Sequence, residues 1–370
     1  MKFTVLTKTL IDAVNTVSRV NTKSVTNPIY EQIFLKVENH TLILRATNLE
    51  VIIEKNIPIK ADINGSIIVK SHIFSKIITN ISKNSESISL EKNGNILTIQ
   101  VGENISEIEI LEEESFPGLP IAINTITTIN SKTFLDLLRS VSFCAASSDI
   151  KPEISSVFIY TKENLLFAVA TDSYRLAEKK ISTEIQENIE MILPIKNVTN
   201  ILSVFEASET DLIIESYQNG VIISNKDTFL ATRIINGNFP DYKQLFPKDF
   251  TTTIEVQKDI LLQALQLTTY ISINYSFSLF ILDLLKSKIS ISSKEKSIGS
   301  VKTLLDIKTI SNTENLEKIE VNYNSNYFLE GLQKIDNKNI VINFTTPQRP
   351  MFIQSDSNTS FTYLLMPLNR

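Results

Sequence analysis

The sequence is short of the residues on which most metal sites and disulfides depend. Its 370 residues include one cysteine, two histidines, eight glycines and no tryptophan. A single cysteine, Cys144, excludes an intramolecular disulfide, and such a chain is expected in a reducing compartment. The histidines, His40 and His72, have no cysteine or second histidine at ligand spacing, so we expect no metal site.

The same shortages argue against catalysis. A Ser-His-Asp triad would need His40 or His72, and no nucleophile-elbow sequence supports one. No two glycines lie close enough to form a phosphate-binding loop or a dinucleotide fingerprint. Asp172 could be a catalytic acid, but a turn-capping role is favoured. We therefore expect no catalytic residue and no cofactor. The alternative is an α+β enzyme in which some of these acidic residues are catalytic.

Long apolar runs are missing as well. A membrane-spanning helix needs at least about 18 apolar residues in a row, and the sequence has no such stretch. Thr4, Thr7 and Lys8 interrupt the opening residues, which excludes a signal peptide or anchor there. We expect a cytoplasmic protein with no membrane partner. At roughly 100–200 residues per domain, the length predicts two or three domains.

What the sequence does contain is one plan repeated three times. A helix with apolar residues three and four apart is predicted at residues 9–14, and its counterpart at 133–138 begins 124 residues later (133 − 9). A third version begins near Ile260. Thr47 and Thr171, at the ends of two predicted strands, are also 124 residues apart (171 − 47), and Asn48 and Asp172 follow them as turn formers.

Two further landmarks repeat in each third. A second helix is predicted near residues 71–82, 195–205 and 326–335. A closing strand then runs into Pro117, Pro240 and Pro367, where proline cannot donate to a sheet ladder. Stretches of alternating polar and apolar residues between these landmarks predict half-buried antiparallel strands. The alternative is chance similarity among unrelated domains. It is harder to exclude for the third copy, whose match to the other two is weaker.

The predicted fold is therefore α+β, with three repeated domains that each pack two helices on antiparallel sheets. We place the domains at residues 1–121, 122–248 and 249–370. Joining the copies at their sheet edges would give the backbone N–H and C=O groups of the edge strands hydrogen-bond partners. A head-to-tail contact that repeats in this way closes into a ring where the rotation allows, with sheets outside and helices lining the hole.

Several segments resemble the bacterial DNA polymerase III beta subunit, the sliding clamp, and the resemblance extends over the full length. The segments at residues 170–177 (ATDSYRLA) and 237–242 (GNFPDY) are the most specific matches. Residues 1–5, 346–350 and 365–368 are also similar to the family. The resemblance implies that each domain has the DNA clamp fold and that the protein is not an enzyme. It also implies a head-to-tail homodimer that forms a ring around double-stranded DNA and binds it without sequence specificity.

The resemblance also implies partners that dock through short linear peptides. They are the DNA polymerase III catalytic subunit, the clamp loader, repair polymerases and mismatch-repair proteins. Carried onto matching positions, the walls of the peptide-binding pocket would be Ile154, Thr171, Ser173, Tyr174, Arg175, Leu176, Pro240, Gln244, Leu245, Leu364, Met366, Pro367 and Leu368. Gln244 stands where many family members have arginine. Without the resemblance, simple packing of a domain junction would be the favoured interpretation of these residues.

The resemblance also implies which residues form the dimer interface. The dimer interface would use Ser106, Ile108 and Ile110 on the first domain and Ile271 and Ile273 on the partner's third domain. Ser106 occupies a position that is often aromatic, which puts the strength of the interface in question.

The net charge of -5 is an objection to DNA binding, since DNA-binding proteins usually carry a basic excess. The family is nevertheless acidic overall and positive inside the hole. The expected DNA-facing residues are Lys8, Arg19, Lys23, Lys70, Lys76, Lys83, Arg139, Lys151 and Lys196. This basic bias is marked only in the first domain, and it suits loose, non-specific contact with the phosphate backbone. The alternative function is a monomeric peptide-binding adaptor that does not encircle DNA.

Overall fold

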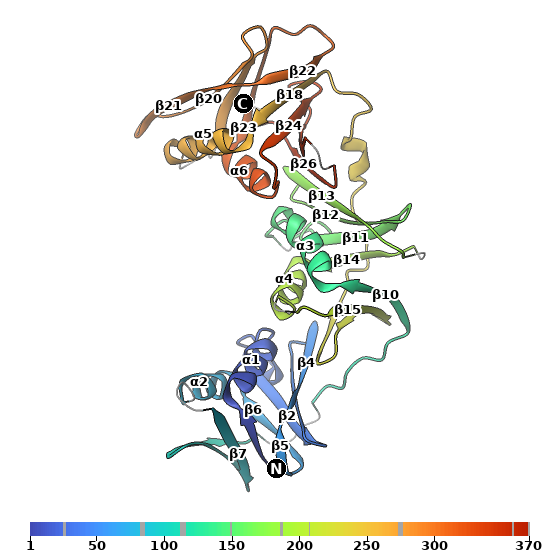
Figure 1. Ribbon diagram of the computed structural model, residues 1–370, viewed down its shortest axis with the longest axis vertical. Coiled ribbons are helices and arrows are strands. Elements are labelled where there is room, and N and C mark those ends of the chain that lie inside the picture. Colours follow the sequence, from blue (N-terminus) through green and yellow to red (C-terminus); the bar gives the residue numbers. More distant parts are fainter. Residues whose placement is uncertain are drawn as a thin grey trace. The chain divides into compact units, whose positions relative to one another are not determined.

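The structure is a computed structural model of the chain. It describes residues 1–24, 27–81, 86–111, 116–148, 150–185, 188–206, 208–272, 277–356 and 359–368. The chain forms two compact units (Figure 1). Unit 1 comprises Met1–Leu135 and Lys196–Ile234, and unit 2 comprises Asp136–Ile195 and Ile235–Arg370.

Unit 1 is built on two antiparallel sheets. The five-stranded sheet has the order β5 (Lys60–Ile63), β1 (Lys2–Leu6), β7 (Ser87–Asn93), β8 (Ile96–Val101) and β9 (Asn104–Glu109). The eight-stranded sheet has the order β10 (Asn124–Asn130), β15 (Asp211–Tyr217), β16 (Gly220–Ser224), β17 (Thr228–Arg233), β4 (Val51–Pro58), β3 (Thr41–Thr47), β2 (Gln32–Glu38) and β6 (Gly65–Lys70). Buried and less buried residues alternate along β2 and β3, as expected for strands with one face on a core.

Amphipathic helices cover the sheets of unit 1. They are α1 (Thr7–Ser18), α2 (Ser71–Ile81) and most of α4 (Ile195–Val204), with a short 3₁₀ turn η1 (Pro28–Glu31). Helix α1 buries the stripe Leu10, Ala13, Val14 and Val17 and packs on β3, β4 and α2. Apolar residues three and four apart lie on one side of a helix, which is why the sequence spacing located it.

Unit 2 repeats this design with a nine-stranded and a four-stranded sheet. The first has the order β14 (Glu190–Pro194), β11 (Ser156–Lys162), β12 (Leu165–Thr171), β13 (Arg175–Ser182), β26 (Phe361–Leu365), β25 (Met351–Ser355), β24 (Asn339–Phe344), β18 (Thr252–Gln257) and β22 (Lys308–Asn312). The second has the order β21 (Gly299–Asp306), β20 (Lys288–Glu295), β19 (Phe277–Asp283) and β23 (Lys318–Asn324). The helical segments are α3 (Ser131–Val141), which begins in unit 1, η2 (Ser142–Cys144), η3 (Tyr242–Leu245), α5 (Lys258–Ile271) and α6 (Ser325–Gln333).

Two strand ladders join the predicted domains into continuous sheets. In unit 1, β17 pairs with β4, so that Thr232 lies opposite Val51. In unit 2, β13 pairs with β26, so that Leu176 lies opposite Leu364. All six predicted helices are confirmed, and so is the antiparallel α+β fold. The compact units do not follow the thirds of the sequence because these ladders tie neighbouring domains together edge to edge.

Among the described residues, no helix is long and apolar enough to cross a membrane.

Gly331 in α6 offers a test of how tightly this core is packed. A methyl group there would lie 2.2 Å from Cε1 of Tyr363, a fully buried ring whose hydroxyl donates to the Tyr327 carbonyl. We expect Gly331→Ala to lower the free energy of unfolding by about 2 kcal/mol, because overpacking outweighs the gain of about 1 kcal/mol in helix propensity. Denaturant titration measures this. Gly118→Ala is the control, since no described atom lies within 4 Å of its added methyl. Equal stability of the two variants would contradict the packing of α6 on β26.

Candidate functional site

The turn between β12 and β13 is closed by its own side chains. The Thr171 hydroxyl donates to the Arg175 carbonyl (2.6 Å) and accepts from the Ser173 amide (3.1 Å). Asp172 Oδ1 accepts from the amides of Tyr174 (2.9 Å) and Arg175 (3.0 Å). Ser173 takes a left-handed φ of 75°, a conformation that serine seldom adopts. The predicted capping role of Asp172 is therefore confirmed, and the turn leaves Ser173 and Tyr174 exposed at its tip.

The Arg175 side chain folds back into unit 2 instead of pointing to solvent. Its guanidinium donates to Asp172 (3.0 Å), Glu330 (2.5 Å) and the Phe143 carbonyl (3.0 Å), and it stacks 4.0 Å from the centre of the Tyr327 ring. Burial alone would lower the pKa of Arg175, but the hydrogen bond to Glu330 and nearby acidic groups raise it above its ordinary value. Arg175 thus ties β13 to η2 and α6, while its expected contact with a bound peptide stays a prediction.

The strand that follows this turn supplies the floor of the candidate site. Leu176 on β13 and Leu364 on β26 face each other across the ladder, and each is only 2% exposed. Just beyond the ladder, the Met366 amide donates to the Tyr174 carbonyl (2.9 Å). This bond holds the segment after β26 beside the exposed turn.

The C-terminal segment continues along the same side of the site. Met366, Pro367 and Leu368 are all half-buried, and the Leu368 amide donates to the Asn322 carbonyl on β23 (2.8 Å). A methionine next to a proline and a leucine gives an adaptable apolar surface. The structure therefore brings these three predicted wall residues next to the turn.

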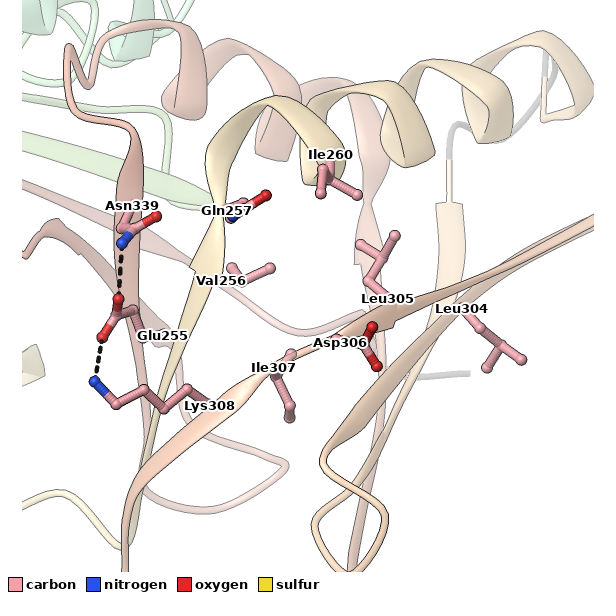
Figure 2. Close-up of a pocket in the computed structure, with 10 residues that line it drawn as sticks. All are labelled: Glu255, Val256, Gln257, Ile260, Leu304, Leu305, Asp306, Ile307, Lys308 and Asn339. Atoms are coloured by element: carbon pink, nitrogen blue, oxygen red, sulfur yellow. Dashed lines mark hydrogen bonds and ion pairs between the residues drawn. The ribbon is translucent and has the colours of Figure 1, made fainter.

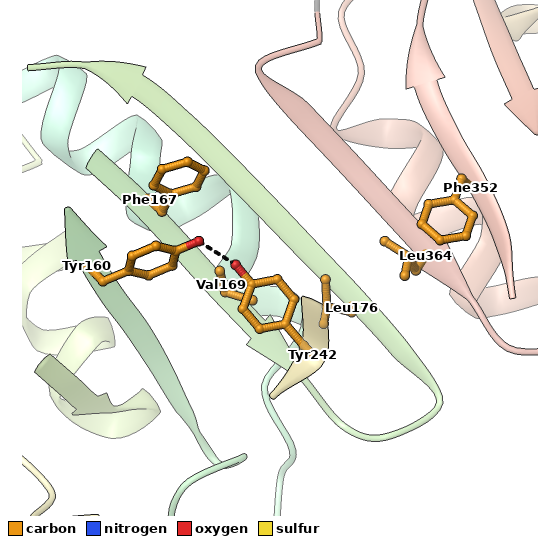
Figure 3. Close-up of a cluster of buried hydrophobic side chains, with 7 residues drawn as sticks. All are labelled: Tyr160, Phe167, Val169, Leu176, Tyr242, Phe352 and Leu364. Carbon is orange, nitrogen blue, oxygen red and sulfur yellow. Dashed lines mark hydrogen bonds between the residues drawn. The ribbon is translucent and has the colours of Figure 1, made fainter. Parts of the chain in front are cut away.

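The connector that precedes the third domain carries further residues of the predicted wall. Its 3₁₀ turn η3 carries Gln244, which is exposed and donates to Asp241 (3.0 Å), and Leu245, which is half-buried. Leu245 packs against a buried cluster, shown in Figure 3, that includes Leu176 and Leu364. Pro240, just before η3, is exposed.

Ile154 lies in the turn before β11, where its amide donates to the Lys151 carbonyl (3.2 Å) and its own carbonyl accepts from Ala146 (2.9 Å). Its side chain is half-buried. Its place in the pocket wall stays a prediction.

The equivalent turn in unit 1 has the same backbone geometry and a different rim. Thr47 bonds the Val51 carbonyl (2.9 Å), Leu49 takes a φ of 66°, and the Arg233 amide donates to the Glu50 carbonyl (3.1 Å). Here, however, the side chains of Arg233 and Glu50 form an ion pair (3.6 Å). Tyr174 and Met366 occupy the corresponding positions in unit 2, so an aromatic and an apolar side chain stand there in place of the charged pair.

Comparison with known proteins identifies the family. Models of the N-terminal, central and C-terminal domains of the DNA polymerase III beta subunit match residues 1–120, 128–241 and 243–369. The chain belongs to this family. This is the family of the sliding clamp, a non-catalytic processivity subunit of the replication machinery.

Individual relatives agree over the whole length. The beta sliding clamp of Staphylococcus aureus is 23% identical over 378 residues, which cover 100% of this chain and 99% of the relative. The DNA polymerase III beta subunit of Thermotoga maritima matches the fold with a TM-score of 0.91 at 22% identity, covering 100% of this chain and 99% of that one. The sliding clamp of Pseudomonas aeruginosa bound to griselimycin has a TM-score of 0.92 at 19% identity, with full coverage of both chains.

The basic residues expected to face DNA are distributed over both units of the clamp subunit. Lys8, Arg19, Lys23, Lys70, Lys76 and Lys196 lie in unit 1, and Arg139 and Lys151 lie in unit 2; all eight side chains are exposed. Arg139 forms an ion pair with Asp136 (3.0 Å), and this acidic neighbour offsets the attraction of Arg139 for phosphate. Lys83 lies outside the described residues.

The residues expected at the dimer interface lie at sheet edges or beside them. Ser106 and Ile108 are on β9, the edge of the five-stranded sheet, and Ile110 follows it. Ile271 ends α5, and Ile273 lies outside the described residues. In unit 2, β21 is the edge of the four-stranded sheet.

Sequence reasoning missed a cavity of about 490 Å³ next to β21 (Figure 2). Glu255 bridges Lys308 (3.2 Å) and Asn339 (2.8 Å) on one side of it. Ile260 and Leu304 supply exposed apolar surface on the other side. The residues that line this cavity come from strands and a helix, and Glu255 and Asn339 among them are 84 residues apart in the sequence. No local sequence motif could therefore have predicted the cavity.

Arg175 gives a test of the site's internal support. We expect Arg175→Lys to lower the free energy of unfolding by about 2 kcal/mol, because lysine cannot reproduce the planar, stacked and multiply bonded guanidinium. Arg139→Lys is the matched control and should change stability by less than about 0.5 kcal/mol, since its ion pair is solvent-exposed. Both values come from denaturant titration. A loss no larger than the control's would show that Arg175 does not tie the site together.

Proposed function

We propose that this subunit closes into a head-to-tail homodimeric ring around double-stranded DNA and tethers the replicative polymerase. Polymerase, clamp loader, repair polymerases and mismatch-repair proteins would dock through short linear peptides. The domains would span residues 1–121, 122–248 and 249–370, and the protein would act in the cytoplasm. The observation that carries the peptide-docking role is the hydrogen bond that holds Met366 beside the exposed Tyr174, next to the paired Leu176 and Leu364.

The side chains around this turn support a peptide site. The floor is buried, while Met366, Pro367, Leu368 and Leu245 are half-buried and can gain contacts from a ligand. In binding sites lined mainly by apolar side chains, burial of these side chains supplies most of the affinity, and a few polar groups orient the ligand. Ser173 and Gln244 are exposed polar residues at the turn and the connector, whereas the Thr171 hydroxyl is already engaged within the turn.

Ring closure would use two of the sheet edges, β9 and β21. Strand β9 carries Glu107 and Glu109, and strand β21 carries Lys302 and Asp306, so Lys302 offers one opposite charge to the acidic edge of β9. Each edge also exposes one large apolar residue, Ile105 at 61% and Leu304 at 60%. Pairing β9 of one copy with β21 of another would satisfy both rows of backbone groups. The cavity beside β21 adds Ile260 to this surface.

Contact with DNA would be loose and electrostatic. The exposed lysines and arginines of both units neutralise phosphates without reading bases, which permits sliding. The net charge of -5 repels the duplex, so contact with DNA would depend on the local groups of basic side chains.

A monomeric peptide-binding adaptor is the alternative. It would use the same peptide site and would leave β9 and β21 unpaired.

Topological retention distinguishes these functions. After loading by the cognate clamp loader, we expect the protein to remain on nicked circular DNA and to leave the same DNA once it is linearised, because a ring slides off free ends. Gel filtration of the protein–DNA complexes measures the retained fraction. An incubation without clamp loader is the control. Equal loss from circular and linear DNA would support the adaptor and contradict the ring.

The peptide site has its own test. We expect Met366→Ala to weaken binding of a peptide from the polymerase catalytic subunit by about tenfold, since truncating a central apolar contact typically costs over 1 kcal/mol. Met191→Ala on β14, also half-buried, is the matched control and should bind like the original protein. Fluorescence anisotropy gives both affinities, and sedimentation checks that both variants remain dimers. Unchanged affinity for Met366→Ala would remove this pocket assignment.

A further inference from the structure

We propose that a buried chain of Tyr160, Tyr242 and Glu178, closed by Lys243, is a positioning device that fixes one wall of the peptide site. This inference rests on the proposed peptide-docking function. Glu178, Tyr242 and Lys243 form no part of the expected pocket wall. They would act by holding the connector, whose next residues, Gln244 and Leu245, do belong to that wall.

The chain of hydrogen bonds has a defined direction. Tyr242 donates to Glu178 Oε2 (2.5 Å), and the hydroxyls of Tyr160 and Tyr242 lie 2.7 Å apart (Figure 3). Because the single Tyr242 proton is given to the carboxylate, Tyr160 must be the donor to Tyr242. Burial and the neighbouring Glu178 carboxylate raise the pKa of Tyr242, so the hydroxyl keeps its proton. The connector is thereby bonded directly to both β13, through Glu178, and β11, through Tyr160.

Lys243 completes the device from the solvent side. Its ammonium lies 2.6 Å from Glu178 Oε2 and sits over the rings of Tyr242 (4.8 Å), Phe167 (5.1 Å) and Phe246 (5.1 Å). Glu178 is 6% exposed, and a carboxylate so buried requires both a counterion and donors. Two consecutive residues of η3 meet this requirement, which fixes the turn in place and orientation.

The device and the pocket floor share one face of the nine-stranded sheet. Glu178 and Leu176 are two residues apart on β13, so their side chains point the same way about 7 Å from each other. Tyr160 lies opposite Phe167 across β11 and β12, and Val169 lies opposite Glu178. Leu176, Tyr160 and Tyr242 belong to one buried cluster against which Leu245 packs. A shift of η3 would therefore move Leu245 relative to the floor on which a peptide rests.

In general, a purely apolar contact of similar shape often stabilises a fold as well as a buried ion pair does. Replacing a buried ionic group with apolar side chains is often neutral or stabilising, so a polar device here is better explained by the geometry it imposes. Apolar contacts alone, from Leu245 and Phe246, would hold η3 without fixing its register on the sheet.

The test is a double-mutant cycle on peptide affinity in the full-length dimer, with the peptide of the polymerase catalytic subunit as probe. We expect Tyr242→Phe to weaken binding about fivefold, because both hydrogen bonds to the connector are lost. Tyr160→Phe should change affinity less than about twofold, since the Tyr242–Glu178 bond remains. In a Leu245→Ala background, Tyr242→Phe should have almost no further effect, because the wall that it positions has been removed. In a Met366→Ala background, on the other wall, the fivefold loss should persist.

Each other outcome has a definite meaning. If Tyr242→Phe binds as tightly as the original protein, or loses the same factor with and without Leu245, the positioning role is overturned. If the original protein binds no peptide, the proposed function fails independently of this inference. If Tyr242→Phe does not fold, Lys243→Met takes its place in the same cycle, since it removes the counterion of Glu178 from the exposed end. An unfolding titration of every variant separates lost affinity from lost stability.

Discussion

The antiparallel ladder between β13 and β26 is the constraint on which the candidate site depends. It places Leu176 against Leu364 and brings the Met366 amide onto the Tyr174 carbonyl, although these residues are separated by most of the second and third domains. The ladder converts two domains into one sheet and sets the turn, the C-terminal segment and the connector side by side. Because each neighbouring strand satisfies the backbone groups of the other, the site needs no separate scaffold.

Repetition of this ladder shows how a duplicated plan acquires one specialised site. The turns at Thr47 and Thr171 share their hydrogen bonds and a left-handed residue, so their backbones have the same local conformation. Side chains alone make the difference: a charged pair, Glu50 and Arg233, rims one, and Tyr174 with Met366 rims the other. An ion pair at the rim would have to be desolvated by an apolar peptide, at a cost that the second rim avoids.

Local sequence rules predicted much of the fold because its elements are locally encoded. Apolar spacing located the helices, and threonine followed by asparagine or aspartate located the turns. The resemblance supplied the pocket residues, and the structure gathers those from the turn, the connector and the C-terminal segment. The inward course of Arg175 could not be predicted, since its partner Glu330 is 155 residues away. The same holds for Tyr242 and Glu178, 64 residues apart, whose pairing depends on how the connector crosses the sheet.

Amide hydrogen exchange at Met366 tests the central claim most directly. The bond from this amide to the Tyr174 carbonyl exists only if the end of β26 continues along β13 and carries the apolar rim to the turn. We predict that the Met366 amide exchanges at least about 100-fold more slowly than in an unstructured peptide, in step with the amides of the β13–β26 ladder. Exchange at the unstructured rate while the ladder stays protected would show that the rim is not held against the turn, and the account of the site would be wrong.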